Sequence, residues 1–348
     1  MHINTLELED EDLRIIANSE QVYEAWLSAS REENLLPDWM TWKPVNGTQY
    51  LYEARQGLGE PKSLGPRSPV TEKVKAEFDT KKAEIQDRVD STAARLKKLL
   101  SQYQSLHLPQ VMSLPGKILR ALDINNYLGN DLIVVGTTAF AAYEIEARER
   151  FAHGLDETED FDLGWCRGSN LSVKETSRAV GSPLFSTIRQ VDSSFQLNKK
   201  KPYQAINKHG FEVELLTAPS VMKTLSSTEV FSTMAIHEQE WLLLGSPIRH
   251  LVCARDGAPA PLVVPDPRWM GLHKLWLANK ETRRADKKGK DAKQGDLLLD
   301  AVARKMTTNY PMDVDFVLSL PQDLLPVFNG WAQQRGFVPG NRPPRPDW

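Results

Sequence analysis

The chain has 348 residues, of which 41% are hydrophobic and 26% charged, and a formal net charge of −3. This composition is typical of a globular protein and excludes both a disordered chain and a uniformly basic nucleic-acid binder, while the length favours two or three domains. Two cysteines, Cys166 and Cys253, are too few for a disulfide scaffold and indicate a reducing compartment. No apolar run approaches the ~20 residues that span a bilayer, and the acidic start is unlike a targeting peptide. We therefore expect a cytoplasmic protein with no membrane partner.

The N-terminal region is expected to be helical with one β-hairpin. Asn46-Gly47, inside WKPVNGTQYLYEAR, is a strong two-residue turn signal and predicts a hairpin over residues 42–55. Glycine and proline at 57–69 indicate a loop. Apolar residues then recur at roughly heptad spacing, which predicts a long helix over residues 70–104, or alternatively a helical hairpin.

The middle of the chain alternates predicted strands and helices. DLIVVGTTAFAAYE contains a short apolar strand, a tight turn at Gly136 and an alanine-rich helix. TEDFDLGW (158–165) predicts a second strand, a helical pattern follows over residues 171–190, and HGFEVELLT (209–217) predicts a third strand. This alternation is typical of an α/β domain.

The last third of the chain is expected to be mainly helical. Short strands are predicted at IHEQEWLLLG (236–245) and RHLVCAR (249–255), followed by two helices around a very basic bend at 280–293. The resulting division is an N-terminal helical region with a hairpin (1–119), an α/β domain (120–225) and a C-terminal mainly helical domain with a basic segment (226–348).

Two of the predicted strands place carboxylates on one face. Because side chains alternate along a strand, Asp160 and Asp162 share a face, and so do Glu212 and Glu214. Three converging carboxylates repel one another, so the cluster needs cations, and carboxylate oxygens are the ligands that Mg²⁺ prefers. Two metals held about 4 Å apart serve phosphoryl or nucleotidyl transfer. The alternative is a pair of solvated acids on an edge strand.

A glycine turn offers a second feature. Gly136 ends a strand, and Thr137 and Thr138 open the helix after it, so backbone N–H groups and hydroxyls are available to a phosphate. The alternative is a structural turn and helix cap.

Cations in the C-terminal region could face a triphosphate or a nucleic-acid backbone. Lys274 lies on an apolar helix, where a lysine needs an anionic partner or a route to solvent. The basic bend adds Arg283, Lys287 and Lys290. The alternative is a solvated helix–loop–helix.

Together these segments resemble the nucleotidyltransferase superfamily. GTTAFAAYE, TEDFDL and GFEVELLTAP follow its order of a glycine turn, a D-x-D strand and a third acid on a later strand. WKPVNGTQYLYEAR, SLGPRSP, PDPRWMGLHKLW and the basic segment are similar to bacterial nucleotidyltransferase-fold proteins of unknown substrate, so the resemblance covers residues 40–305. More distantly, the chain resembles abortive-infection nucleotidyltransferase toxins, whose helical lysine and downstream Lys-Asp pair would be Lys274, Lys290 and Asp291.

The resemblance implies an α/β (α+β) nucleotidyltransferase fold with a mixed central sheet. It implies a Mg²⁺- or Mn²⁺-dependent transfer of NMP from an NTP. The metal-binding and catalytic residues would be Asp160, Asp162 and Glu214, and the nucleotide-binding residues Gly136, Thr137, Thr138, Lys274, Arg283 and Lys290. Two departures are a glutamate at 214 in place of the usual aspartate, with Glu212 on the same face, and threonine where the turn more often has serine or glycine.

The acceptor stays open at this stage. An RNA 3′ end such as a tRNA, in a toxin-like role with an antitoxin partner, agrees with the basic segment and with Tyr50 and Tyr52 on the hairpin. The alternative for these two tyrosines is an ordinary packed hairpin. A protein hydroxyl or a small molecule is an alternative acceptor. A different class of function is a catalytically silent module that binds nucleic acid or a partner protein, and the glutamate at position 214 keeps that class open.

Overall fold

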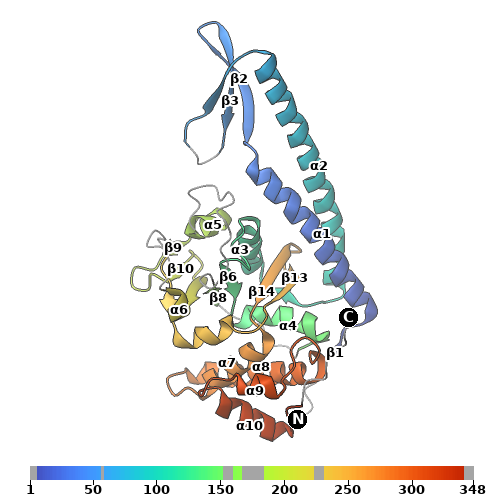
Figure 1. Cartoon of the computed structure of the whole chain (residues 1–348), viewed down its shortest axis with the longest axis vertical. Coiled ribbons are helices and arrows are strands. Elements are labelled where there is room, and N and C mark those ends of the chain that lie inside the picture. Colours follow the sequence, from blue (N-terminus) through green and yellow to red (C-terminus); the bar gives the residue numbers. More distant parts are fainter. Residues whose placement is uncertain (1–5, 56–58, 152–159, 167–183, 223–230, 341–348) are drawn as a thin grey trace.

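The computed structural model describes residues 6–55, 59–151, 160–166, 184–222 and 231–340, with the side chain of Asp160 left out. The described residues form a body from which a long arm rises, and a small sheet lies at the tip of the arm (Figure 1). The fold is mixed α/β, as the sequence predicts. Most of the helical segment predicted at 171–190 lies outside the described residues, and only its end is described, as part of α5 (Leu184–Val191).

Two long helices that pack against each other form the shaft of the arm, α1 (Asp10–Leu35) and α2 (Pro69–Ser105). Ser68 caps α2 by accepting a hydrogen bond from the backbone N–H of Thr71, and Pro69 occupies the first helical position, where its missing N–H costs nothing. The 37 residues of α2 extend about 55 Å at 1.5 Å per residue. The predicted long helix is confirmed.

The tip of the arm is a sheet of β2 (Trp39–Val45), β3 (Thr48–Ala54) and β4 (Lys62–Pro66), in that order. Asn46 and Gly47 both have positive φ, as a tight two-residue turn requires, so the predicted hairpin is confirmed. The loop predicted over 57–69 is wrong for its second half, because β4 pairs with β3 there. An edge strand tolerates the proline and glycine that the prediction took as loop signals, since Pro66 ends the strand at the outer edge. Residues 56–58 lie outside the described part.

The central sheet of the body has the strand order β6-β8-β11-β10-β9, with β12 beside β11. β6 runs antiparallel to β8, and β8 runs parallel to β11, so the sheet is mixed as predicted. The strands are β6 (Leu132–Val134), β8 (Asp160–Trp165), β9 (Gln196–Leu197), β10 (Gln204–Ile206), β11 (Glu212–Thr217) and β12 (Met234–Ala235). The 3-10 turn η1 (Thr137–Ala139) and α4 (Phe140–Ala147) follow β6, and α6 (Pro219–Met222) follows β11.

A second sheet joins the arm to the body through β5 (Gln110–Val111), β13 (Ile248–Ala254) and β14 (Pro259–Val264), in the order β14-β13-β5. Helix α3 (Ser113–Ile124) packs on β14, and α1 reaches β13. The short strands β1 (Leu6–Glu7) and β7 (Glu149–Arg150) pair with each other.

The C-terminal part is helical: α7 (Pro267–Asn279), α8 (Ala285–Lys305), α9 (Val314–Leu318) and α10 (Leu325–Arg335). The two helices predicted around the basic bend are α7 and α8 and are confirmed. Within the described residues, no helix has both the length and the apolarity that a bilayer span requires.

The strand predicted at 236–245 is wrong, because the segment forms the 3-10 helix η2 (His237–Leu243). Residues three apart share a face of a 3-10 helix, which places Glu238 with Trp241 and Gln239 with Leu242, and these side chains are all buried. The buried positions of this segment are therefore spaced three residues apart, as in a 3-10 helix, and do not alternate as in a strand.

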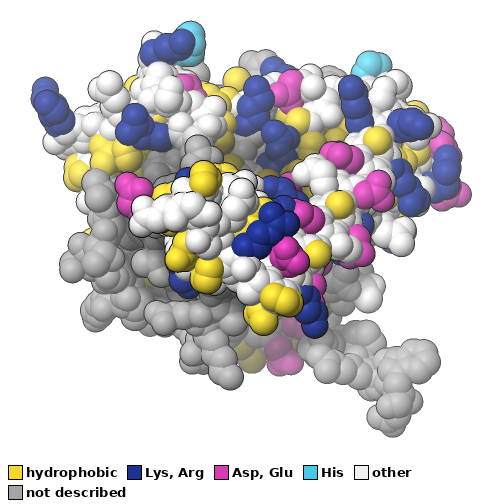
Figure 2. Space-filling model, turned by 90° about the horizontal axis from the view of Figure 1, so that it is seen from above, with side chains coloured by type: hydrophobic (Ala, Val, Ile, Leu, Met, Phe, Trp, Pro, Cys, Tyr) yellow, Lys and Arg dark blue, Asp and Glu magenta, His cyan; other side chains and the backbone are white. Residues whose placement is uncertain are grey.

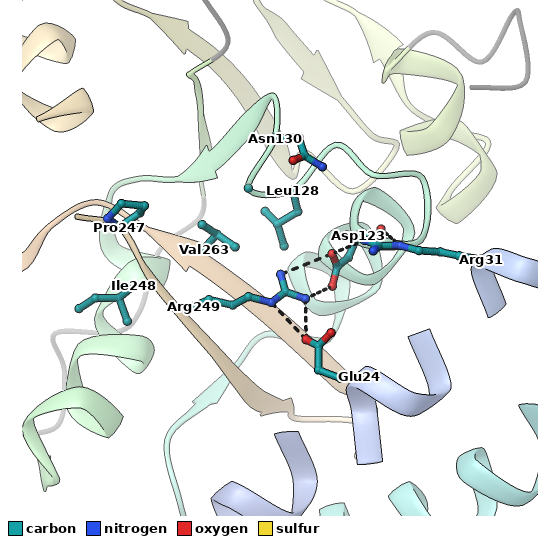
Figure 3. A pocket seen from close by; sticks show the side chains of 10 residues that line it. Glu24, Arg31, Asp123, Leu128, Asn130, Pro247, Ile248, Arg249 and Val263 are labelled. Carbon is teal, nitrogen blue, oxygen red and sulfur yellow. Dashed lines mark hydrogen bonds and ion pairs between the residues drawn. The ribbon is translucent and has the colours of Figure 1, made fainter. Parts of the chain in front are cut away.

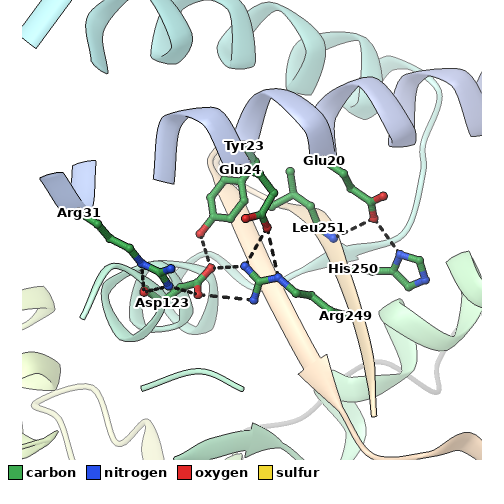
Figure 4. A network of polar contacts seen from close by, with 8 residues as sticks. All are labelled: Glu20, Tyr23, Glu24, Arg31, Asp123, Arg249, His250 and Leu251. Carbon is green, nitrogen blue, oxygen red and sulfur yellow. Dashed lines mark hydrogen bonds and ion pairs between the residues drawn. The ribbon is translucent and has the colours of Figure 1, made fainter. Parts of the chain in front are cut away.

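A polar network attaches the arm to the body (Figure 4). The fully buried carboxylate of Asp123 accepts hydrogen bonds from Tyr23 Oη (2.8 Å), Arg31 Nη2 (3.1 Å) and Arg249 Nη2 (2.9 Å). Arg249 also donates to Glu24 on α1. Because α1 supplies Tyr23, Glu24 and Arg31 and the body supplies the rest, the network holds the shaft at one angle to the body.

A histidine extends this attachment. The two ring nitrogens of His250 lie 2.8 Å from Glu20 Oε1 and 2.9 Å from Glu146 Oε2. Burial opposes the charged form of His250, but these two hydrogen bonds outweigh it and raise its pKa to about 9. At neutral pH the imidazolium therefore joins α1 to α4 as a charged group.

Candidate functional site

The carboxylates of β8 and β11 lie in matched register. The two strands run parallel, and Asp162 pairs with Glu214 while Asp160 pairs with Glu212. The alternate residues of both strands are fully buried on the opposite face: Phe161, Leu163, Val213 and Leu215. The sheet thus turns its apolar side to the core and brings the acids together, as the alternation predicts.

The glycine turn lies directly against Asp162. Gly136 has φ 74°, and a β-carbon added there would stand 2.4 Å from Asp162 Oδ2. The N–H of Val135 donates to the carbonyl of Asp162 (3.1 Å), which ties the end of β6 to β8 at this point. Position 136 therefore requires glycine both for its backbone angle and for the space that the carboxylate occupies.

The threonines after the glycine are also close to the site. Thr137 is half-buried and Thr138 buried. Gln294 of α8 donates from Nε2 to Thr137 Oγ1 at 3.4 Å. Since Oγ1 accepts this bond, its own proton is available for donation to another group.

Glu212 and Glu214 share a single amide. Gln204 of β10 is buried and donates from Nε2 to Glu212 Oε2 (2.6 Å) and to Glu214 Oε1 (3.0 Å). Asn198 in turn donates to Gln204 Oε1 at 2.7 Å, which fixes the orientation of the amide. Gln204 thus places a positive N–H dipole between two carboxylates and holds the side chain of Glu214 in position.

The predicted cations meet at one carboxylate. Lys274 of α7 lies 3.0 Å from Asp291 Oδ1, and Arg283 lies 2.6 Å from Asp291 Oδ2. Lys274 and Asp291 are buried, whereas the Arg283 side chain is 28% exposed. Burial lowers the pKa of Lys274, and the negative charges of Asp291 and Asp162 oppose that shift. Two cations against one carboxylate leave this triad with a positive charge, and it faces the acidic strands through Asp162.

Close packing of α7 on α8 makes the triad possible. A β-carbon on Gly295 would lie 2.7 Å from the Leu275 side chain and 2.9 Å from the carbonyl oxygen of Gly271. Without side chains at these positions the helix backbones approach closely enough for Lys274 and Asp291 to pair. Lys290 is half-buried on α8, one residue before Asp291.

The donor set is suitable for a hard divalent cation. Asp162 and Glu214 offer carboxylate oxygens at one register position, and the space at Gly136 leaves Asp162 uncrowded. Among the side chains that the structure describes, no three His, Cys, Asp or Glu gather closely enough to form a metal site, and the Asp160 side chain is not among them.

A cavity lies elsewhere, at the base of the arm (Figure 3). It has a volume of about 360 Å³ and is lined by residues that include Leu128, Val263, Arg31 and Arg249. Both arginines pair with Asp123. Because its cations are already neutralised by buried or nearby acids, this cavity offers no charge to a triphosphate, and the acidic strands remain the better candidate site.

The sequence analysis did not single out Gln204 and Gln294. Gln204 could have been found from the hairpin register, since a turn at residues 207–210 places it opposite Glu214. Gln294 lies one helical turn after Asp291, but its contact to Thr137 joins elements that are 157 residues apart in the sequence and leaves no local signal.

Comparison with known proteins agrees with this geometry. Searches of the curated proteins and of the solved structures found no match. A family model described as "Nucleotidyltransferase" matches residues 114–314, which is more than half of the 348-residue chain and contains the glycine turn, the acidic strands and the lysine–aspartate–arginine triad. The chain therefore belongs to this nucleotidyltransferase family.

Proposed function

We propose that the protein transfers a nucleoside monophosphate from an NTP to a 3′ hydroxyl of RNA. The observation that carries the proposal is the contact of the Gly136 turn with Asp162, opposite Glu214 on the neighbouring strand. In the proposed reaction the acceptor oxygen forms a bond to the α-phosphorus and loses its proton, the bond to the β-phosphate oxygen breaks, and pyrophosphate leaves.

Asp160, Asp162 and Glu214 would hold Mg²⁺ or Mn²⁺, which when bound supplies positive charge to the phosphates and lowers the pKa of a coordinated hydroxyl. We include Asp160 because it lies two residues before Asp162 in β8, on the same face of the strand, and pairs with Glu212. Gln204 would keep Glu214 directed at the site through the bond to its Oε1. The matched register of the strands supports this assignment.

The triphosphate would lie between the glycine turn and the positive triad. Thr137 can donate its hydroxyl proton because Gln294 occupies its oxygen, and Gly136 and Thr138 contribute the backbone of the turn. Arg283 is more accessible to an incoming phosphate than Lys274, since their side chains are 28% and 6% exposed. The buried Lys274 would act through its positive charge without contacting the phosphates, and the half-buried Lys290 would add a second positive charge nearby. Catalysis would then be largely a matter of positioning and electrostatics.

The test is transfer of label from each α-³²P-NTP, with Mg²⁺ or Mn²⁺, to total RNA and total protein. We expect labelled RNA with the wild type and none with Asp162→Asn, while Asp323→Asn, an exposed aspartate between α9 and α10, retains activity. If protein and not RNA is labelled, the proposed reaction stands but its acceptor is a protein hydroxyl. Absence of both transfer and NTP binding would overturn the catalytic proposal and leave a silent binding module.

A further inference from the structure

One face of the arm-tip sheet is apolar and inward, and the other is open. Met40 and Leu51 point inward and form a small core with Phe78 of α2. Strand alternation turns the intervening residues outward. We call this outer side the arm-tip face, defined by Trp39, Thr41, Lys43, Tyr50 and Tyr52.

The register places the members of the face side by side. Thr41 pairs with Tyr52, and Lys43 pairs with Tyr50. Lys43 Nζ lies 4.9 Å from the centre of the Trp39 ring and 5.4 Å from the centre of the Tyr52 ring. Trp39 is 36% exposed although it is among the largest apolar side chains. An ammonium group between two aromatic rings on an open sheet offers both stacking surfaces and a charge to a ligand.

The charge of the tip differs from that of the whole chain. Residues 39–55 and 62–67 carry the basic residues Lys43, Arg55, Lys62 and Arg67 and a single acid, Glu53, whereas the chain as a whole has a net charge of −3. Figure 2, viewed from above, shows Lys and Arg, Asp and Glu, and hydrophobic side chains interspersed on this side of the molecule. Lys43 lies on the arm-tip face, whereas Arg67 stacks on Trp42 of the inner face and pairs with Glu72. An aromatic face that carries the Lys43 cation is complementary to an anionic ligand with flat rings.

We propose that the arm-tip face binds single-stranded RNA, as the place where the acceptor of the proposed reaction is held away from the active site. The role as acceptor site rests on the proposed function, whereas the binding itself does not. Proteins bind single strands by stacking bases on aromatic side chains beside cations that contact the phosphates. Trp39, Tyr50 and Tyr52 would supply the stacking surfaces, and Lys43 would supply the charge on the face.

The attachment of the arm gives the face a fixed place. Asp123 and His250 tie α1 to the body, and α2 extends about 55 Å from base to tip at 1.5 Å per residue. In Figure 1 the tip sheet stands above the side of the body that carries α5, β9 and β10. A rigid arm of this length selects acceptors that reach from the tip to the acidic strands.

The experiment measures binding by fluorescence anisotropy of a labelled single-stranded RNA of about twelve nucleotides, and of the duplex of the same sequence, on the full-length protein. The variants are Trp39→Ala with Tyr52→Ala, Trp39→Phe, Lys43→Glu and the control Lys97→Glu, which makes the same charge change on the exposed shaft. The outward direction of the substituted side chains leaves the core of Met40, Leu51 and Phe78 intact, and thermal melting checks this.

We expect the wild type to prefer the single strand, with affinity that falls as salt rises. The double alanine variant should bind at least about 25-fold more weakly, because the loss of each stacked base costs about five- to a hundred-fold and the two losses multiply. Lys43→Glu should also weaken binding, while Trp39→Phe and Lys97→Glu should bind like the wild type.

Unchanged RNA binding by the folded double alanine variant, or equal binding of duplex and single strand, would overturn the proposal. Absence of RNA binding by the wild type would also overturn the proposal, and capture of a protein through this face would then identify a different class of partner. Asp162→Asn separates the two proposals, because it should bind RNA normally and transfer no label. If the double alanine variant transfers label normally, the proposal that the arm-tip face holds the acceptor is refuted and the proposed function stands. If the wild type binds RNA but transfers no label, the proposed function is refuted and RNA binding at the face stands.

Discussion

Gly136 and Asp162 are in such close contact that a β-carbon at position 136 would stand 2.4 Å from Asp162 Oδ2. The turn after β6 and the carboxylate of β8 can share this space only because residue 136 has no side chain. The contact links the element proposed to hold phosphates to the element proposed to hold metal, so changes at either residue should affect the same step.

Gly136→Ala should abolish nucleotidyl transfer. The new methyl group would displace Asp162, and the backbone at φ 74° and ψ −153°, a conformation that essentially only glycine adopts, would cost about 1 to 3 kcal/mol of folding free energy. Activity and urea unfolding are measured together. Gly336→Ala is the control for a positive φ, since Gly336 has φ 62° and ψ 25°, in the left-handed region, with nothing within 4 Å of the added carbon. It should lose less stability than Gly136→Ala and no activity. Wild-type activity in Gly136→Ala would contradict the prediction, because it would show that the reaction does not depend on the position of Asp162 beside residue 136.

Asp291→Asn should be the most destabilising single change in the cationic triad. It leaves the cations of Lys274 and Arg283 together without their carboxylate, and removal of one partner from a buried pair costs about 3 to 5 kcal/mol. Lys274→Met should cost less, because Arg283 still pairs with Asp291. Chemical denaturation measures both, and Asp286→Asn, in the exposed pair with Arg284, should change little.

The double variant Lys274→Met/Asp291→Leu should recover part of the stability lost in Asp291→Asn, since it removes the buried charges together. It should not recover nucleotidyl transfer, because the fixed positive charge behind the proposed phosphate site is gone. Recovery of activity together with stability would mean that the triad has only a structural role.

Gln204→Leu should reduce both stability and activity. Glu212 and Glu214 would lose the amide that separates them, and the loss of two hydrogen bonds to charged acceptors costs about 1 to 3 kcal/mol. The activity should become more dependent on the Mg²⁺ concentration, because a loosely held Glu214 binds the cation less well. A Mg²⁺ titration of activity checks this against Gln196→Leu, an exposed glutamine on β9 that should behave like the wild type.

The attachment of the arm should weaken in alkaline solution. The pKa of His250 rises from 6.5 to about 9 on folding, so the folded state binds the proton more tightly. The stabilisation is therefore complete below pH 6.5, declines above it and is lost as the pH passes about 9. Its full size is on the order of 3 kcal/mol. Urea unfolding across this range measures the decline. His250→Gln should remove it, and His209→Gln, at an exposed position, should not.

Much of the site was predictable from local patterns. The alternation in TEDFDLGW and GFEVELL determined that each strand has one acidic and one apolar face, because successive side chains of any strand point to opposite sides. Asn46-Gly47 determined a hairpin, since few other residues adopt positive φ twice in succession. The division of the chain at residues 119 and 225 stays a prediction.

Other features depend on residues that are distant in the sequence. The sequence showed that Lys274 needs an anionic partner on its apolar helix, but only the packing of α7 on α8 decided that Asp291 supplies it and that Arg283 shares it. The hold of Gln204 on Glu214 and the contact of Gln294 with Thr137 likewise arise from strand register and helix packing. Local periodicity determines which way a side chain points within its own element. The tertiary structure decides what it meets, because that depends on the burial and close packing of the whole chain.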